Sequence, residues 1–306
     1  MRSLIVHNPA SGYGSNAVFE FVRELVRPED ECVIRSLGSS PVADALSDAD
    51  DFDLIVISAG DGTLTNALYA LRNSDVTTCV FPSGTANLLF ANLGNAPEPK
   101  SIATACHEGT TRALDLGEMS WVTEDGSEHV SGFGIMSGIG FDAELMSTAE
   151  QGKATLGEAA YFTAAFSNLN PKVADFTVTV DGEEHRCRGI SCIVANAAMM
   201  QGDIILSPGC RMDDGLLDVM VLEAPDAVRL LLPIIAGFID PSGDILGRPH
   251  IVRFRGRQIE ISSSEPLHIQ LDGDAMEGLV TGYTARCLPA CNPVIVDPHS
   301  PYYAQA

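Results

Sequence analysis

The sequence predicts two domains: an α/β domain over residues 1–116, built on a parallel sheet, and a larger, mostly antiparallel β-rich domain over residues 117–289. Two observations support this prediction. Up to about Leu116, short apolar runs alternate with helical periodicity, which is typical of a parallel sheet covered by helices. Beyond that point, period-2 segments and hairpin turns dominate, as they do in sandwiches and barrels. The tail over residues 290–306 has one more apolar run, which could return to the first domain.

Strands and helices are expected to alternate through the first domain. Apolar, β-branched runs predict strands at residues 4–7, 31–35, 54–58 and 79–81. Helical spacing predicts helices at residues 17–26, 42–49, 66–71, 88–93 and 100–107.

Hairpins are expected in the second domain. Residues 176–180 alternate apolar and polar side chains and end at Asp181-Gly182, a dipeptide that favours a two-residue hairpin turn. Residues 120–123 and 129–135 predict another hairpin. Further strands are predicted at residues 190–195, 217–222, 251–255, 258–261, 267–271 and 284–288, with helices at 154–168 and 227–238.

The composition argues against several classes of protein. Of the 306 residues, 45% are hydrophobic and 19% charged, which is ordinary for a globular protein. The net charge of −23 would repel nucleic acid and argues against simple electrostatic docking on an anionic membrane. The 8 cysteines lack zinc-ligand spacing and fit a reducing cytosol. Because no apolar run suits a membrane span or a signal peptide, a cytoplasmic location is expected.

The most informative stretch is LIVISAGDGT at residues 54–63. An apolar strand breaks into Gly60-Asp61-Gly62-Thr63, and helical spacing follows. A strand, a glycine turn and a helix N-terminus together bring backbone N–H groups against a phosphate. Since a carboxylate would repel a bare phosphate, Asp61 fits better beside a metal, a ribose hydroxyl or a backbone amide. An Asp-Gly turn without any ligand is the alternative.

Three loops of this kind follow predicted strands of the first domain. They are residues 8–14, 60–63 and 82–87, all rich in small and hydroxyl side chains. Because the carboxyl ends of parallel strands meet at one edge of a sheet, the loops predict a pocket for a polyanion. The chain has no Walker-type lysine motif. Backbone amides and Mg²⁺ would therefore have to offset the charge of a triphosphate.

Two acidic turns of the second domain are candidates for catalysis and metal binding. Leu271-Asp272-Gly273-Asp274 ends a strand, and a carboxylate there could serve as general base for phosphoryl transfer to a hydroxyl. Residues 213–218 carry three carboxylates around a turn, which suits a hard cation such as Mg²⁺. A plain hairpin turn and a solvated acidic turn are the alternatives, which the residues alone favour.

An ordered set of motifs covers nearly the whole chain, from near residue 4 to residue 278. The first three are Asn8-Pro9-Ala10-Ser11-Gly12, Ala59-Gly60-Asp61-Gly62-Thr63 and Ser83-Gly84-Thr85-Ala86-Asn87. The later ones lie at residues 137–143, 153–161, 194–196, 208, 214–218 and 272–274. Together they resemble the diacylglycerol kinase catalytic family, which includes bacterial lipid kinases and the sphingosine and ceramide kinases.

The resemblance implies an ATP-dependent lipid kinase that uses Mg²⁺ and phosphorylates a lipid hydroxyl, diacylglycerol-like or sphingoid. It also implies an NAD kinase-like α/β domain, a β-rich domain, and an active site in the cleft between them. The residues that would hold the nucleotide are Asn8, Pro9, Ala10, Ser11, Gly12, Ser36, Gly60, Asp61, Gly62, Thr63, Thr65, Gly84, Thr85 and Asn87.

The same resemblance implies roles in catalysis and metal binding. Asp274 stands where the family has its catalytic Glu, and Asp61 is assigned to catalysis with it. The family's structural Mg²⁺ site would fall on Asp214 and on the backbone carbonyls of Arg211 and Leu216.

The expected partner is a lipid at a membrane surface, met peripherally and transiently. Asp142 matches a position that faces the substrate head group in sphingoid-base kinases. Nucleic acid is not expected as a partner, and a homodimer is a further expectation.

Several positions depart from the family pattern, namely Ala59, Thr65, Asn66, Leu88, Asn92, Asp274 and residues 201–203. Asp274 is one methylene shorter than Glu, so it would have to approach the hydroxyl more closely. These departures leave the acceptor open. They also leave a nucleotide- or lipid-binding regulator without catalysis as an alternative. The net charge of −23, which disfavours an anionic membrane, leaves a kinase of a soluble metabolite as another.

Overall fold

The computed structural model describes residues 1–11, 16–141, 143, 172–200, 204–223, 236, 240, 242–243 and 245–303. The helix expected at 154–168 and nearly all of that at 227–238 lie outside these residues, as do Gly12 and Asp142. The chain divides into two compact units. Unit 1 comprises Met1–Leu116, Met212–Asp214 and Leu288–Ala306, and unit 2 comprises Gly117–Arg211 and Gly215–Cys287.

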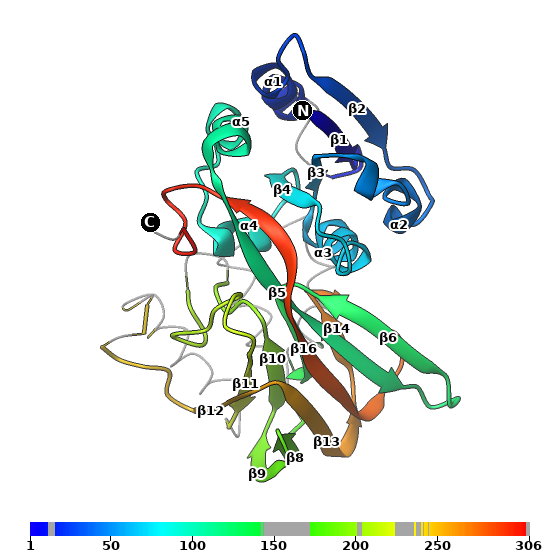
Figure 1. Ribbon diagram of the computed structural model, residues 1–306. Coiled ribbons are helices and arrows are strands. Elements are labelled where there is room, and N and C mark those ends of the chain that lie inside the picture. The colour runs from blue at the N-terminus through cyan, green and yellow to red at the C-terminus, as the bar shows by residue number, and fades with distance from the viewer. Residues whose placement is uncertain are drawn as a thin grey trace, which may run out of the picture. The chain divides into compact units, whose positions relative to one another are not determined.

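Unit 1 is built on a parallel sheet with the strand order β2–β1–β3–β4 (Figure 1). The register places His7 at the end of β1 beside Ser36 of β2 and Ser58 of β3. β3 is buried along its whole length, which explains its continuous apolar run. The parallel α/β domain predicted from the sequence is confirmed. The strands are β1 (Arg2–His7), β2 (Glu31–Ser36), β3 (Leu54–Ala59) and β4 (Thr77–Pro82).

Helices connect these strands. They are α1 (Asn16–Leu25), α2 (Val42–Ala45), α3 (Asp61–Ala70), α4 (Leu88–Leu93) and α5 (Pro99–Glu108), with a 3₁₀ turn at Ala49–Asp51. α3 begins five residues before the expected helix at 66–71, because extended Gly60 is its N-cap and the glycine turn forms its first helical turn. α2 is shorter than the expected helix at 42–49. The polar residues Ser47 and Asp48 follow the helix, and such residues favour turns over helix interiors. The Asp48 carboxylate pairs with Arg35.

Unit 2 is antiparallel, as predicted. One six-stranded sheet has the order β12–β11–β10–β7–β14–β15. A second group pairs β16, β13, β8 and β9 in turn, and β5 pairs with β6. The apolar faces form a core that includes Phe133, Phe176, Val194, Val219 and Ile261. The strands are β5 (Thr110–Val122), β6 (Glu128–Phe133), β7 (Met136–Gly140), β8 (Ala174–Val180), β9 (Glu183–Gly189), β10 (Ser191–Ala195), β11 (Leu217–Leu222), β12 (Ile251–Gly256), β13 (Gln258–Leu267), β14 (Ile269–Leu271), β15 (Asp274–Ala275) and β16 (Val280–Val296).

Three strands, β5, β13 and β16, are much longer than expected, and β13 continues from the predicted 258–261 to Leu267. β5 begins at Thr110, ten residues before the predicted strand. The sequence did not predict this first part because Asp115 and Glu118 interrupt its apolar pattern. Both carboxylates are buried with partners, Asp115 accepting the N–H of Ala290 and Glu118 pairing with Arg286. The far end of β16 pairs in parallel with β4, so the tail of the chain belongs to unit 1.

The second domain was expected to run unbroken over residues 117–289. Residues 212–214 interrupt it, because they belong to unit 1. The N–H of Asp115 donates to the carbonyl of Met212 at 2.7 Å, and Arg112 pairs with Asp213 at 2.6 Å. Among the helices that the structure describes, none has both the length and the apolar character needed to cross a bilayer.

The β5–β6 turn yields a prediction about pH. Hydrogen bonds from Thr123, and from the N–H and hydroxyl of Ser127, lower the pKa of Asp125 to about 2. A depressed pKa means that the ionised carboxylate stabilises the turn above the unfolded-state pKa of about 4, and that this stabilisation disappears as the pH falls through about 2. Titration of the Asp125 carboxyl carbon by NMR should show this low pKa, and a midpoint near 4 would contradict it.

Candidate active site

The described parts of the three predicted loops, residues 8–11, 60–63 and 82–87, lie together at the carboxyl edge of the unit 1 sheet. The side-chain amide of Asn8 donates to the hydroxyl of Thr63 at 3.1 Å. The N–H of Gly60 donates to the hydroxyl of Ser11 at 3.2 Å, which ties the first loop to the second. Side-chain contacts thus hold these loops in one arrangement before any ligand binds.

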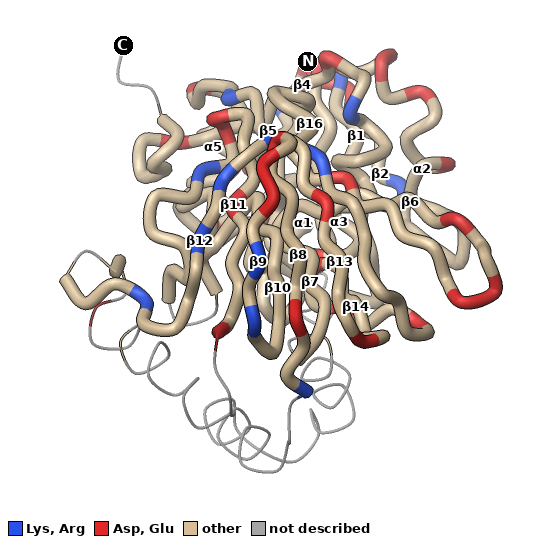
Figure 2. Tube along the Cα trace, turned by 90° about the horizontal axis from the view of Figure 1, so that it is seen from below, with Lys and Arg blue, Asp and Glu red and all other residues tan. Residues whose placement is uncertain are grey.

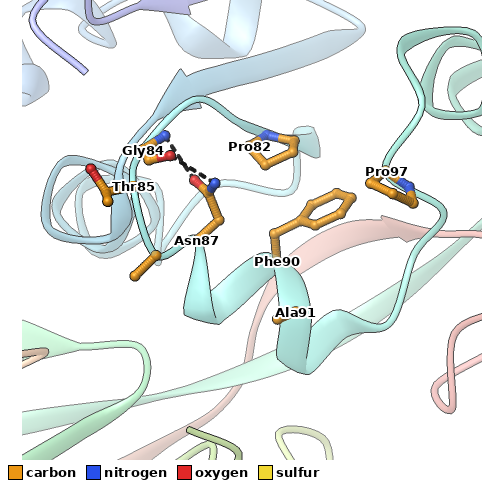
Figure 3. A pocket seen from close by; sticks show the side chains of 8 residues that line it. Pro82, Gly84, Thr85, Asn87, Phe90, Ala91 and Pro97 are labelled. Atoms are coloured by element: carbon orange, nitrogen blue, oxygen red, sulfur yellow. Dashed lines mark hydrogen bonds between the residues drawn. The ribbon is translucent and has the colours of Figure 1, made fainter. Parts of the chain in front are cut away.

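Asp61 joins the second loop to the third. Its two carboxylate oxygens accept the N–H groups of Leu88 and Leu89 at 3.0 Å each, which caps the N-terminus of α4. The cap comes from another helix because Asn87, in the left-handed region with φ 49°, turns its own side chain back onto Gly84 (Figure 3). Of the partners that the sequence left open for Asp61, a backbone amide is the one observed. We therefore treat Asp61 as a positioning residue.

Gly84 allows the second and third loops to approach closely. A Cβ atom at this position would lie 2.5 Å from the Cα atom of Gly60 and 3.1 Å from the side-chain oxygen of Asn87. Real Cβ atoms do not come that close to backbone. The glycine is required by this contact and not by an unusual φ angle.

A row of hydrogen-bonded polar side chains, which the sequence did not predict, lies beneath the loops. The Ser58 hydroxyl is 2.7 Å from the Ser83 hydroxyl and 3.0 Å from Nδ1 of His7. Ser58 is completely buried and Ser83 nearly so. One feature of the sequence could have predicted this row: a polar residue stands at or just after the end of each of the apolar strands β1, β3 and β4. These contacts satisfy buried hydroxyls and connect the three strand ends.

A pocket of about 350 Å³ lies against the third loop. Figure 3 shows the ring of Phe90 between Asn87 and Pro97, so one side of the pocket is polar and the other apolar. Thr85 is exposed at its rim. The full lining is Pro82, Gly84, Thr85, Ala86, Asn87, Phe90, Ala91 and Pro97.

The other predicted nucleotide residues are distributed around this edge. Ser36 is exposed at the carboxyl end of β2, beside His7 in the register. Gly62 lies in the first turn of α3, whereas Thr65 is buried within that helix. Pro9 and Ala10 are exposed in the first loop.

In unit 2, Asp272 and Gly273 form the tight turn between β14 and β15. Both have positive φ, 48° and 93°, as the Asp-Gly pattern predicted. The carboxylate of Asp272 accepts three backbone N–H groups at 2.8–2.9 Å, those of residues 134–136. Asp274, the expected general base, is the exposed first residue of β15. The neighbouring carboxylate therefore anchors the turn that presents Asp274.

The expected metal ligands lie within one short stretch of chain. Arg211, Asp214 and Leu216 are all half-buried. The Asp214 carboxylate and the two backbone carbonyls would supply oxygen donors, the type of ligand that Mg²⁺ prefers. The described residues contain no cluster of three or more His, Cys, Asp or Glu side chains that could hold a metal ion.

The other two carboxylates of the 213–218 turn have a different role. Asp213 pairs with Arg112, and Asp218 accepts hydrogen bonds from Ser207 and from two arginines of β12. Both carboxylates are nearly completely buried. Buried carboxylates need such partners, and the sequence pattern could not show them.

Two family models match the chain. The diacylglycerol kinase catalytic domain matches residues 2–119, and the YegS C-terminal NAD kinase beta sandwich-like domain matches residues 135–296. The chain belongs to the diacylglycerol kinase catalytic-domain family. It is a kinase, a phosphotransferase with an alcohol group as acceptor, as the motifs predicted.

Known proteins of this family resemble the chain over most of its length. The "Probable lipid kinase YegS-like" protein of Pseudomonas fluorescens is 31% identical over 239 residues, which cover 76% of this chain and 74% of that protein. A diacylglycerol kinase of Mycobacterium tuberculosis is 26% identical over 58% of each chain.

Solved structures confirm the fold. A diacylglycerol kinase from Bacillus anthracis has a TM-score of 0.67 at 17% identity and covers 98% of both chains. Yeast NADH kinase complexed with NADH has a TM-score of 0.54 at 13% identity and covers 97% of this chain and 84% of its own. The NAD kinase-like fold that the motifs implied is therefore confirmed.

The contact between Gly60 and Gly84 predicts the effect of a single methyl group. Gly84→Ala should lower the free energy of unfolding by about 1–3 kcal/mol, because the Cβ atom would overlap the backbone of the second loop. Gly38→Ala is the matched control, since nothing lies within 4 Å of its Cβ position. Urea denaturation measures both, and equal midpoints for the two variants would contradict the close approach.

The cap from Asp61 predicts a local effect on α4. Asp61→Asn should lower the free energy of unfolding by about 1–2 kcal/mol, because the amide nitrogen that replaces one carboxylate oxygen cannot accept an N–H group. Hydrogen exchange of the Leu88 and Leu89 amides should therefore accelerate. Asp181→Asn removes the same kind of carboxylate contact in unit 2 and should leave these two amides unchanged. Unchanged exchange in the Asp61 variant would refute the cap.

Proposed function

We propose that this protein is an ATP-dependent lipid kinase that transfers the γ-phosphoryl group of ATP to a lipid hydroxyl. The observation that supports this most strongly is the preassembled edge of unit 1, where Asn8, Ser11, Gly60 and Asp61 hold three small-residue loops together. Such loops suit the phosphates of a nucleotide. The names of the relatives, lipid kinase and diacylglycerol kinase, support a lipid acceptor.

Asp274 is the proposed general base. In this role its carboxylate accepts the proton of the acceptor hydroxyl as that oxygen attacks the γ-phosphorus. Two features support the role. Asp274 is exposed, and the turn before it is fixed by the three N–H groups that bind Asp272. A side chain on a fixed backbone loses less entropy when it meets the substrate.

The Asp214 carboxylate and the carbonyls of Arg211 and Leu216 would hold a structural Mg²⁺. Mg²⁺ bound with the nucleotide would, together with the loop amides, stabilise the transferred phosphoryl group. Asp142, which lies outside the described residues, stays a predicted contact to the acceptor head group. A cytoplasmic enzyme that meets its lipid peripherally at a membrane, and a homodimer, also stay predictions.

Transfer from labelled ATP to a total lipid extract, with the product identified by mass, tests the proposal. Asp274→Asn should lower the rate by about 10²–10⁴, the usual contribution of a general base. Glu277→Gln is the matched control, because Glu277 is an exposed carboxylate three residues away. It should retain full activity.

The outcomes separate the alternatives. Full activity of Asp274→Asn would refute its role as base while leaving the kinase intact. ATP binding by calorimetry without transfer to any lipid would favour a regulator without catalysis. Transfer that needs no lipid or detergent interface would favour a soluble acceptor.

A further inference from the structure

The row of polar side chains beneath the loops, His7, Ser58 and Ser83, contains one hydrogen-bond donor more than it uses. Nδ1 of His7 lies 3.0 Å from the Ser58 hydroxyl, which in turn lies 2.7 Å from the Ser83 hydroxyl. These two hydrogen bonds need two donors. A neutral imidazole has one N–H group and each hydroxyl has one O–H group, so the row has three. One donor is therefore left over at an end of the row.

The end at which this spare donor lies depends on the tautomer of His7. If Nδ1 carries the proton, it donates to Ser58, Ser58 donates to Ser83, and the O–H of Ser83 is left over. If Nε2 carries the proton, both hydrogen bonds run the other way. Ser83 then donates to Ser58, Ser58 donates to Nδ1, and the N–H at Nε2 is left over.

Burial favours the second tautomer. Ser83 is only 5% exposed, and among the described residues its hydroxyl has no partner other than Ser58. Leaving a buried O–H group without an acceptor is unfavourable. Nε2 of His7 also has no protein partner in the described part of the chain, but it is not completely buried, so water reaches it. The favourable tautomer therefore carries its proton on Nε2.

The loops above this row lack a cationic side chain. Basic positions are scarce throughout the chain (Figure 2), with 18 lysines and arginines against 41 acidic residues, and the three loops contain no lysine, arginine or histidine. Their two side-chain amides are already bound, that of Asn8 to the hydroxyl of Thr63 and that of Asn87 to the carbonyl of Gly84. His7 directly precedes the first loop, so its Nε2 offers an N–H group that no protein atom uses.

Arg35, at the same end of the neighbouring strand β2, cannot take this role. It pairs with Val6 in the register, and successive residues of a strand point to opposite faces, so Arg35 and His7 lie on opposite faces of the sheet. Its guanidinium also donates to the carboxylate of Asp48 and to the carbonyl of Ala45.

We propose that the N–H group at Nε2 of His7 donates a hydrogen bond to a phosphate of the bound nucleotide, and that Ser58 and Ser83 are positioning residues that hold the ring in the required tautomer. The proposal rests on the proposed function and adds a phosphate contact that none of the loop motifs contains. The acceptor is a charged oxygen, which makes such a hydrogen bond stronger than one between neutral groups. A histidine would thus supply part of what a lysine supplies in Walker-type loops.

Nuclear magnetic resonance tests the tautomer in the full-length protein. At a mildly alkaline pH, where imidazole is neutral, nitrogen–proton correlation spectra distinguish a protonated ring nitrogen from an unprotonated one. The proton of His7 should lie on Nε2. His107 provides an internal reference, because its Nε2 lies 2.9 Å from the carbonyl of Leu25 and must donate to it. A proton on Nδ1 of His7 would overturn the proposal, since Ser83 would then carry the spare donor.

Two substitutions separate phosphate binding from structural support. His7→Asn keeps an acceptor for the Ser58 hydroxyl but has no group at the place of Nε2, whereas His7→Gln keeps a distal N–H group and loses that acceptor. By calorimetry, His7→Asn should raise the Kd for ATP about tenfold, the effect of one hydrogen bond to a charged group, and should keep the wild-type midpoint in urea. His7→Gln should show the reverse, a nearly unchanged Kd and a lower midpoint.

A nucleotide series identifies the group that His7 contacts. The loss of affinity in His7→Asn should be present for ATP and absent for adenosine, which has no phosphate. ADP and AMP show which phosphate is bound, because the loss disappears with the first nucleotide that lacks it. His107→Gln is the matched control, a half-buried histidine of the same unit whose ring contacts a helix carbonyl. It should leave every Kd unchanged.

Phosphoryl transfer from ATP to lipid, measured in parallel, separates this proposal from the proposed function. If ATP binding depends on His7 as expected but no lipid is phosphorylated, the phosphate contact stands and the lipid kinase fails. If lipid is phosphorylated and His7→Asn binds ATP as tightly as the wild type, the contact is refuted and the kinase stands. Equal losses for ATP and adenosine, or the same effect of both substitutions on Kd, would show a structural role and overturn the contact. An absence of ATP binding by the wild type would overturn both.

Discussion

The candidate nucleotide site depends on one interaction, the double hydrogen bond between the Asp61 carboxylate and the first two amides of α4. It joins the glycine turn after β3 to the loop after β4. It also leaves the side chain of Asn87 available to close that loop on Gly84, and Gly84 in turn brings the backbones of the two loops together. The phosphate-binding edge that we propose is therefore rigid before a ligand arrives. A rigid site loses less entropy on binding than a flexible one.

The same device recurs in unit 2. Asp272 fixes the turn before Asp274 by accepting three N–H groups, and Asp240 accepts those of Gly243, Ile245 and Leu246 in the same way. The chain has 41 acidic residues against 18 lysines and arginines, so cations cannot neutralise every carboxylate. Backbone N–H groups take part of this role, because they stabilise an ionised carboxylate without adding charge. In this protein acidic side chains are structural elements as well as a source of negative charge.

Several of the few arginines pair with buried carboxylates. Arg112 pairs with Asp213, and Arg253 and Arg255 share the carboxylate of Asp218. Burying these two carboxylates therefore uses three of the 18 lysines and arginines.

The sequence by itself determined the local elements and their order. The boundaries of α4 and β11 agree with those predicted, and the Asp181-Gly182 and Asp272-Gly273 turns occur where expected. Apolar runs and glycine turns are local signals, so they need no knowledge of the fold. The tertiary structure alone decided which partners the polar side chains have. Asp61 lies 27 residues from Leu88 in sequence, and Ser58 lies 25 residues from Ser83. Such pairs form only because β3 and β4 are neighbours in the sheet, and no periodicity along the chain encodes that neighbourhood.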